Sequence, residues 1–199
     1  IGGINYGIAK NVQLIAVRVL NCSGSGSTSG VIAGIDWVTT NAARPAVANM
    51  SLGGGISLSL DTAVNNSINS GVSYAIAAGN SGQNACNFSP ARVSNAITVG
   101  ATNNSDARPS WSNYGKCLDL FAPGVSIQSA WIGSDTATNT ISGTSMATPH
   151  VAGVVALKLQ GSPTATPGEA IAELIAKSTK GVVKSSGKNS PNQLLFSDY

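Results

Sequence analysis

The chain has 199 residues, a length that suits one domain with a hydrophobic core of its own. Apolar residues make up 42% of it and charged residues only 10%, which excludes a disordered chain and predicts a folded protein with a weakly charged surface. A net charge of +3 is too small and too dispersed to form a basic stripe for nucleic acid, and no apolar run approaches the ~18 residues of a membrane span. Neither nucleic acid nor a membrane is therefore an expected partner.

The first residues, 1–5, contain neither an initiator Met nor the basic and apolar regions of a signal peptide. We therefore expect that a leader was removed or that the chain was cut. The chain has 3 cysteines, an odd number, so at least one thiol has no partner within it. A single histidine, His150, excludes a histidine-rich metal centre.

Strands and helices alternate along the chain. The β-branched run 12–20 predicts a strand covered on both faces, and apolar residues at helical spacing between Val31 and Val38 predict the helix after it. The same patterns predict further strands at 46–52, 73–78 and 96–100, and further helices at 60–70, 145–160 and 169–178. Strands separated by helices pair in parallel through right-handed crossovers. The expected fold class is therefore α/β, a three-layer, mostly parallel sheet with helices on both faces.

In open parallel sheets the ligand site lies at the carboxyl ends of the strands. The loops that follow Leu20, Leu52 and Ala78 are therefore the places where we expect functional residues, and all three are rich in Gly, Ser and Asn. Two of these loops, 23–26 and 51–55, present glycine backbone that would hydrogen-bond an extended peptide.

The segment 143–153 combines a turn glycine with a serine at the start of a buried helix. The first amide groups of a helix lack intrahelical acceptors and carry partial positive charge, so a nucleophile at Ser145 has an oxyanion binder in its own N–H group. Pro149 is expected to be tolerated because the first helical turn needs no N–H donors. Spacing alone leaves open a second interpretation, in which Ser145 only caps the helix.

His150 has the usual chemistry of a general base, but it lies five residues after Ser145. Five helical residues rise about 7.5 Å and pass well beyond one turn, which places the ring away from the serine hydroxyl. We therefore expect a packed, hydrogen-bonded structural histidine. Asn80, at the tip of the strand 73–78, is either a turn residue or, beside a nucleophile, a second oxyanion donor.

At these positions the chain resembles the subtilisin-like serine proteases, because segment 143–153 is similar to their nucleophile motif. The similarity runs along essentially the whole chain, through segments 51–53, 77–80 and 112–115. Residues 18–26 and the placement of Cys86 and Cys117 most resemble the secreted branch that includes proteinase K and aqualysin.

The resemblance implies a role for each of these residues. Ser145 would be the nucleophile and Asn80 the oxyanion donor of a secreted serine endopeptidase with a Ser-His-Asp mechanism. The residues implied to line the primary specificity pocket are Ser51, Leu52, Gly53, Ala78 and Gly79. Those implied to pair with the substrate backbone are Gly24, Ser25 and Gly26.

The resemblance also implies a disulfide and a structural calcium ion. Cys86 and Cys117 would be bonded to each other, and Cys22 would pair with a cysteine just upstream of the catalytic histidine. The implied Ca²⁺ ligands are the Asp119 carboxylate and carbonyl groups around Ser94 and Ala96. Hard oxygen ligands of this kind suit Ca²⁺.

The chain does not complete the family's triad. In subtilisin the chain order is Asp, His, Ser, and the resemblance places the first two motifs upstream of Ile1. We therefore expect 1–199 to be the carboxyl-terminal portion of a single subtilisin-like peptidase domain. Its expected partners are the amino-terminal segment of the same protease, peptide or protein substrates, and a propeptide or inhibitor. The alternative is a non-catalytic, peptide-binding fragment.

Overall fold

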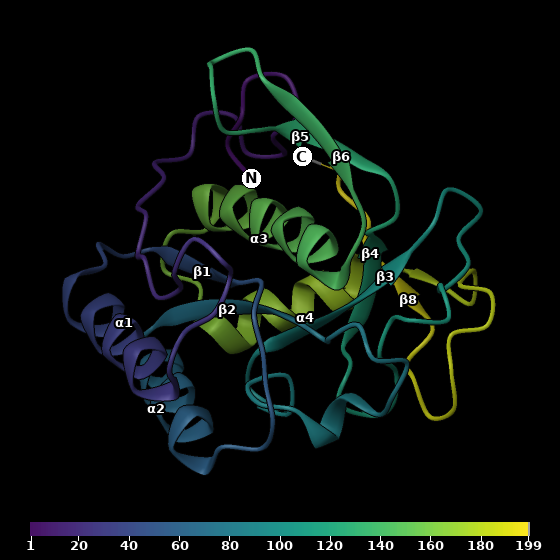
Figure 1. Ribbon diagram of the computed structural model, residues 1–199, viewed down its shortest axis with the longest axis horizontal. Coiled ribbons are helices and arrows are strands. Elements are labelled where there is room, and N and C mark those ends of the chain that lie inside the picture. The colour runs from purple at the N-terminus through teal and green to yellow at the C-terminus, as the bar shows by residue number, and fades with distance from the viewer. Residues whose placement is uncertain (199) are drawn as a thin grey trace.

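The computed structural model describes residues 1–198, and its centre is a six-stranded sheet (Figure 1). In spatial order the strands are β1 (Ala46–Met50), β2 (Val72–Ala77), β3 (Ile97–Thr102), β4 (Leu120–Pro123), β8 (Gln193–Leu194) and β7 (Thr179–Lys180). All neighbours from β1 to β8 are parallel, and β7 is antiparallel to β8 at the far edge.

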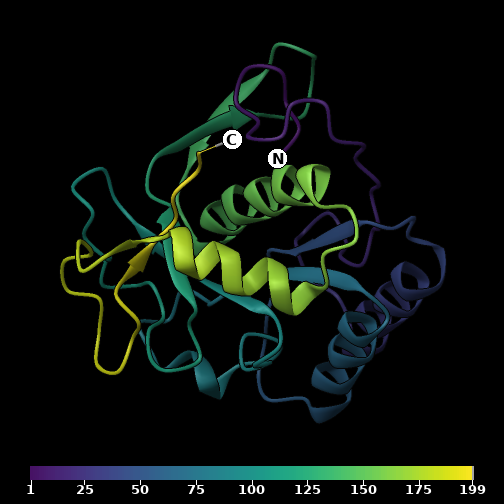
Figure 2. The same ribbon diagram turned by 180° about the vertical axis from the view of Figure 1, so that it is seen from behind.

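Helices cover both faces of this sheet, which confirms the expected three-layer α/β architecture (Figures 1 and 2). One face carries α1 (Thr28–Asn41) and α2 (Leu58–Asn69), and the other carries α3 (Thr144–Gly161) and α4 (Pro167–Lys177). Strand side chains alternate between the two cores. Tyr74 and Ile76 of β2 pack in the core that contains α1 and α2, whereas Ala75 between them packs in the core that contains α3.

Local sequence sets the helix boundaries close to those predicted. Ser27 and Ser57 each accept a hydrogen bond from a first-turn amide, of α1 and α2 respectively. α4 begins with a capping box between Thr166 and Glu169, and Pro167 occupies the first helical position. In the part of the chain that the structure describes, no helix has the length and apolar character needed to cross a membrane.

The predicted strand at 12–20 is wrong. The segment carries no ladder to any strand among residues 1–198. Val19 packs toward α1, where a Cβ added to Gly34 would lie 2.4 Å from Val19 Cγ1, whereas Leu14 and Ile15 are 63% and 54% exposed. A β-branched run forms a strand only where a neighbouring strand supplies hydrogen bonds. Within the described residues, the edge strand β1 pairs with β2 alone.

A hairpin outside the main sheet was not predicted. β5 (Ile127–Ala130) and β6 (Thr138–Ile141) are antiparallel, project from the edge of the molecule and lead into α3 (Figure 1). Their residues are mostly polar and none is fully buried, so the sequence contains no buried apolar alternation to mark them. The hairpin delivers the chain to Gly143 at the start of α3.

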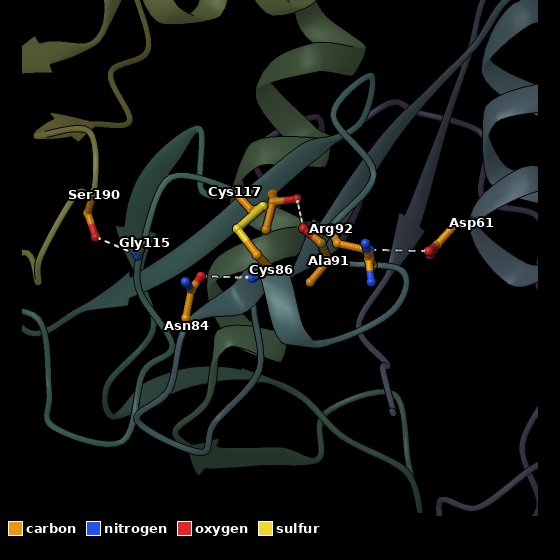
Figure 3. Close-up of a disulfide and its surroundings, with 9 residues drawn as sticks. Asp61, Asn84, Cys86, Ala91, Arg92, Gly115, Cys117 and Ser190 are labelled. Carbon is orange, nitrogen blue, oxygen red and sulfur yellow. Dashed lines mark hydrogen bonds and ion pairs between the residues drawn. A yellow bond between two sulfur atoms is a disulfide. The ribbon is translucent and has the colours of Figure 1, made fainter. Parts of the chain in front are cut away.

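The implied disulfide is confirmed. Cys86, in the short 3-10 helix η1 (Ala85–Asn87), is bonded to Cys117, in the loop before β4, with a Cα–Cα distance of 5.3 Å (Figure 3). Asn84 Oδ1 accepts a hydrogen bond from the Cys86 N–H group at 3.0 Å and fixes the start of η1. Cys22 is an exposed free thiol within the described residues.

Candidate active site

Three polar segments meet where β1 and β2 end and α3 begins. Ser51 follows β1, Asn80 follows β2, and Ser145 is the second residue of α3. The Ser51 hydroxyl donates to the Ser145 carbonyl at 2.9 Å, and the Thr144 N–H donates to Asn80 Oδ1 at 2.9 Å. The structure therefore brings the predicted nucleophile, the predicted oxyanion donor and one predicted pocket residue together at the carboxyl edge of the sheet.

The Asn80 side chain is held by its carbonyl oxygen. Both the backbone N–H and the hydroxyl of Thr144 donate to Asn80 Oδ1, each at 2.9 Å, and the Gly79 N–H donates to the Thr144 hydroxyl at 3.1 Å. Because these donors occupy Oδ1, the orientation of the amide is fixed and its Nδ2 group is left to donate elsewhere. Thr144 is fully buried, and sequence reasoning assigned it no role.

Gly143 keeps the space between two donors open. A Cβ added to Gly143 would lie 3.5 Å from Asn80 Nδ2 and 3.6 Å from the Ser145 backbone nitrogen. The Ser145 N–H belongs to the first helical turn, where no intrahelical acceptor exists. The same Cβ position lies 3.6 Å from Met146 Sδ. Two N–H groups that converge on one point form a binding site for a developing oxyanion.

Asn113 shapes the loop that carries Asn80. It is fully buried, its Nδ2 donates to the Ala78 carbonyl at 2.7 Å, and its Oδ1 accepts from the Ser81 and Gln83 N–H groups at 3.0 Å. Gly79 adopts φ +101°, and a Cβ there would lie 2.5 Å from Asn113 Nδ2. Only glycine fits this close approach. The sequence signal was a polar residue inside the segment 112–115, but nothing local showed what it contacts.

Ser145 has no base beside it in the described part of the chain. Its Oγ lies 3.4 Å from the Ser51 carbonyl oxygen, a weak contact. His150 Nδ1 lies 2.8 Å from the Met146 carbonyl oxygen within α3, so this nitrogen donates. Burial lowers the pKa of His150, against the effect of that hydrogen bond. This geometry fits the expected structural histidine.

The explanation predicted for Pro149 is wrong. Because α3 begins at Thr144, Pro149 is the sixth helical residue and lies beyond the first turn. An N–H at this position would bond to the Ser145 carbonyl four residues earlier. The Ser51 hydroxyl bonds to that carbonyl instead, which explains why proline is accepted here.

The comparisons with known proteins agree with this geometry. The model of the subtilase family matches residues 2–195. The chain belongs to the subtilase family. It is 63% identical over 199 residues to an extracellular serine proteinase of Thermus sp. (strain Rt41A), covering 100% of this chain and 48% of that protein. It is 58% identical over 197 residues to alkaline serine exoprotease A of Vibrio alginolyticus, covering 99% of this chain and 36% of that protein.

A solved structure also supports membership of the subtilase family. The crystal structure of a cold adapted subtilisin-like serine proteinase matches with a TM-score of 0.96 and 56% identity, covering 100% of this chain and 71% of that chain. This subtilase chain thus spans about half the length, or less, of the curated relatives named above.

Two glycine-rich segments are predicted to hydrogen-bond a peptide substrate. Gly54 exchanges backbone hydrogen bonds with Ser89 at 2.9 and 3.2 Å, which anchors the segment after Ser51. Asn21 Oδ1 accepts from the Ser23 and Ser25 N–H groups and shapes the exposed loop that holds Gly24, Ser25 and Gly26. Of the other predicted pocket residues, Leu52 is half-buried, Gly53 and Gly79 are accessible, and Ala78 is fully buried. None carries a charge.

Asp119 lies beside the start of β3. Its Oδ2 accepts from the Thr98 N–H at 2.7 Å, and its own N–H donates to the Thr98 carbonyl at 3.0 Å. Burial raises the pKa of Asp119 to about 6, against the effect of the Thr98 hydrogen bond. Among the described residues no Lys or Arg forms an ion pair with Asp119, and no group of three acidic, His or Cys residues gathers for a metal. Any cation held here would therefore depend on one carboxylate and backbone carbonyls, such as those of Ser94 and Ala96.

Proposed function

We propose that this chain carries the nucleophile and the oxyanion-binding part of a secreted serine endopeptidase that hydrolyses peptide bonds by a Ser-His-Asp mechanism. The observation that carries the proposal is the fixed amide of Asn80, whose Oδ1 accepts from the N–H of Thr144, the residue next to Ser145 at the amino-terminal end of α3. A helix that only needed a cap would not require Asn80, Thr144 and Asn113 to be arranged around it.

In the proposed reaction Ser145 Oγ attacks the carbonyl carbon of the scissile peptide bond, and its proton passes to a general base. The carbonyl oxygen becomes an oxyanion, which accepts hydrogen bonds from the Ser145 N–H and Asn80 Nδ2. Collapse of this intermediate breaks the C–N bond, and the base returns its proton to the leaving amine. Water then hydrolyses the acyl-enzyme by the same route.

The general base and its orienting carboxylate come from an upstream segment of the same protein in this proposal. Three observations support it. The His150 ring is bonded within α3, the chain spans 48% of its Thermus relative, and Leu14 and Ile15 expose apolar surface beside an unpaired stretch of backbone. A strand from that segment would cover this surface.

The substrate in this proposal is an extended peptide that runs between the loop 24–26 and the segment 51–55. Both present glycine backbone, and backbone pairing recognises a peptide whatever its side chains. The same two segments would bind a propeptide or a protein inhibitor. The names of the relatives, one extracellular and one an exoprotease, and the Cys86–Cys117 disulfide support secretion.

We also propose that Asp119, with the carbonyl groups of Ser94 and Ala96, holds a structural Ca²⁺. The Asp119 oxygen that does not bond to Thr98 and the absence of a basic partner among the described residues fit a carboxylate that binds a cation. When bound, the ion neutralises a carboxylate that burial otherwise disfavours.

Covalent labelling tests the proposed reaction. The longer protein that contains this chain should react with a fluorophosphonate at Ser145, one label per molecule, located by peptide mass mapping. Ser145→Ala should abolish both labelling and hydrolysis of a chromogenic peptide, whereas Ser142→Ala, three residues earlier, should leave the label in place. Peptide binding without labelling would favour the non-catalytic alternative.

A further inference from the structure

The backbone of the proposed nucleophile is held from outside its helix. Pro149 has no N–H for the Ser145 carbonyl, and its ring crowds that oxygen. The hydroxyl of Ser51 donates to the same oxygen at 2.9 Å. A side chain at the end of β1 therefore fixes the peptide unit that joins Ser145 to the rest of α3.

Asn49, two residues earlier on β1, controls how that hydroxyl is used. Asn49 Nδ2 donates to Ser51 Oγ at 3.0 Å. A serine hydroxyl has one proton, so a donor on its acceptor side leaves that proton for the Ser145 carbonyl. The three groups form a chain in which each hydrogen bond polarises the next.

The other end of the Asn49 amide is unpaired. Asn49 Oδ1 is buried and has no hydrogen-bond donor among residues 1–198. Buried polar atoms are nearly always paired, so an orphaned acceptor needs an explanation. Asn49 lies on β1, the edge strand beside which the proposed upstream segment would lie.

We propose that Asn49 is a positioning residue for Ser145. It holds the Ser51 hydroxyl on the Ser145 carbonyl, and its Oδ1 accepts an N–H or O–H donor from the segment that supplies the general base. The proposal rests on the proposed function of Ser145 as nucleophile. The hydroxyl and the oxyanion-binding N–H belong to the residue whose carbonyl is held, so loss of the hold misplaces both.

Two variants of the longer protein that contains this chain test the proposal. Asn49→Asp keeps the shape but replaces the donor by an acceptor, which draws the Ser51 proton away from Ser145. Asn49→Leu removes both polar atoms. Each should lower kcat by about 10-fold or more while KM stays within about two-fold, because positioning and not substrate affinity is lost. Asn66→Leu, at an exposed position of α2, is the matched control and should change neither.

A second substitution separates positioning from general destabilisation. Pro149→Ala supplies an N–H to the Ser145 carbonyl and so replaces the bond from Ser51. In the Pro149→Ala background, Asn49→Leu should lower kcat by no more than about two-fold, a coupling that a double-mutant cycle measures directly. The thermal midpoint of each variant shows whether it is folded. If Asn49→Leu is not folded, the same double-mutant cycle is measured with Asn49→Asp in place of Asn49→Leu.

The proposal is overturned if kcat is unchanged in folded Asn49 variants, or if the loss is the same with and without Pro149→Ala. Ser145→Ala distinguishes this failure from a failure of the proposed function. Inactive Ser145→Ala with unaffected Asn49 variants rejects only the positioning role. Turnover that survives Ser145→Ala rejects the proposed function itself.

Discussion

Thr144 holds the proposed oxyanion donor through two hydrogen bonds, and its hydroxyl also accepts from Gly79. Thr144→Val keeps the shape and the backbone bond but loses the hydroxyl. We expect kcat to fall about 10-fold with little change in KM, because Asn80 remains present but is held less firmly. Steady-state kinetics on the longer protein that contains this chain measure this.

The fall in kcat should not exceed the fall caused by removing Asn80 itself. In subtilisin, a member of the same family, loss of the oxyanion asparagine lowers kcat by about 10²–10³-fold, a range taken over from subtilisin and not from this chain. Thr148→Val is the matched control, since Thr148 is equally buried and, within residues 1–198, its hydroxyl bonds only to the Thr144 carbonyl. Equal losses in Thr144→Val and Thr148→Val would contradict a specific role for Thr144.

Asp119 predicts a pH dependence of stability with a definite sign. Its pKa is about 6 in the folded chain against 3.8 as the ordinary value, so the folded state binds the proton more tightly than the unfolded state. The stability from this group is fully present below pH 3.8 and is lost as the pH rises through about 6. In a chelator, the free energy of unfolding should fall over this window by an amount on the order of 3 kcal/mol.

Asp119→Asn should remove this slope, because the amide does not titrate. At pH 7, added Ca²⁺ should raise the thermal midpoint of the wild type and leave that of Asp119→Asn unchanged. Differential scanning calorimetry with and without a chelator measures both effects. A wild-type thermal midpoint that does not change when Ca²⁺ is added at pH 7 would contradict the proposed calcium site.

At the scale of single elements, prediction worked where the determining information is local. The helices α1, α2 and α4 have capping residues and apolar spacing within their own sequence, and β2 is an apolar run buried throughout. The run 12–20 has the same local pattern, yet it needs a partner strand that no described residue supplies. β4 and β8 are short and surrounded by loops, so their pairing depends on distant parts of the chain.

The residues of the candidate site also differ in how far they could be predicted from local sequence. The sequence motif predicted Ser145 and Asn80 as site residues because their chemistry is visible in the residue type and its place at a helix start or a strand end. It did not identify Thr144, Asn113 or Asn49. Their roles depend on hydrogen bonds to residues 30 to 65 positions away or on a chain of contacts through Ser51. A one-dimensional pattern does not contain those contacts.

The disulfide stabilises the loops between η1 and β4. The two cysteines lie 31 residues apart, and closing a loop of that length contributes roughly 3–4 kcal/mol in the chain-entropy model. The double variant Cys86→Ala/Cys117→Ala should lose about this much free energy of unfolding in denaturant titrations. A loss below about 1 kcal/mol in the double variant would contradict this contribution of the disulfide.

On the scale of the whole molecule, α3 is the element on which the others converge. It contacts β1, β2, β3 and β4, and Ile8 of the amino-terminal segment packs on its other side, where a Cβ added to Gly153 would lie 2.6 Å from Ile8 Cβ. The helix is therefore covered on the sheet side and partly on the outer side. The sheet next to it ends at the largely half-buried strand β1, and the side chains of Leu14 and Ile15 are exposed.

This arrangement predicts how residues 1–199 behave when expressed alone. An edge strand without its neighbour and exposed apolar side chains favour association over a stable monomer, so the chain should be poorly soluble and marginally folded. Its peptidase activity should be negligible, because a serine hydroxyl without an adjacent base is a weak nucleophile.

Co-expression with the upstream part of the longer protein should restore a soluble complex and hydrolysis of a chromogenic peptide. The matched control is co-expression of the Ser145→Ala chain, which should restore solubility without activity. Robust turnover by residues 1–199 alone, at the mass of the unextended chain, would reject the proposed division of the triad between two segments.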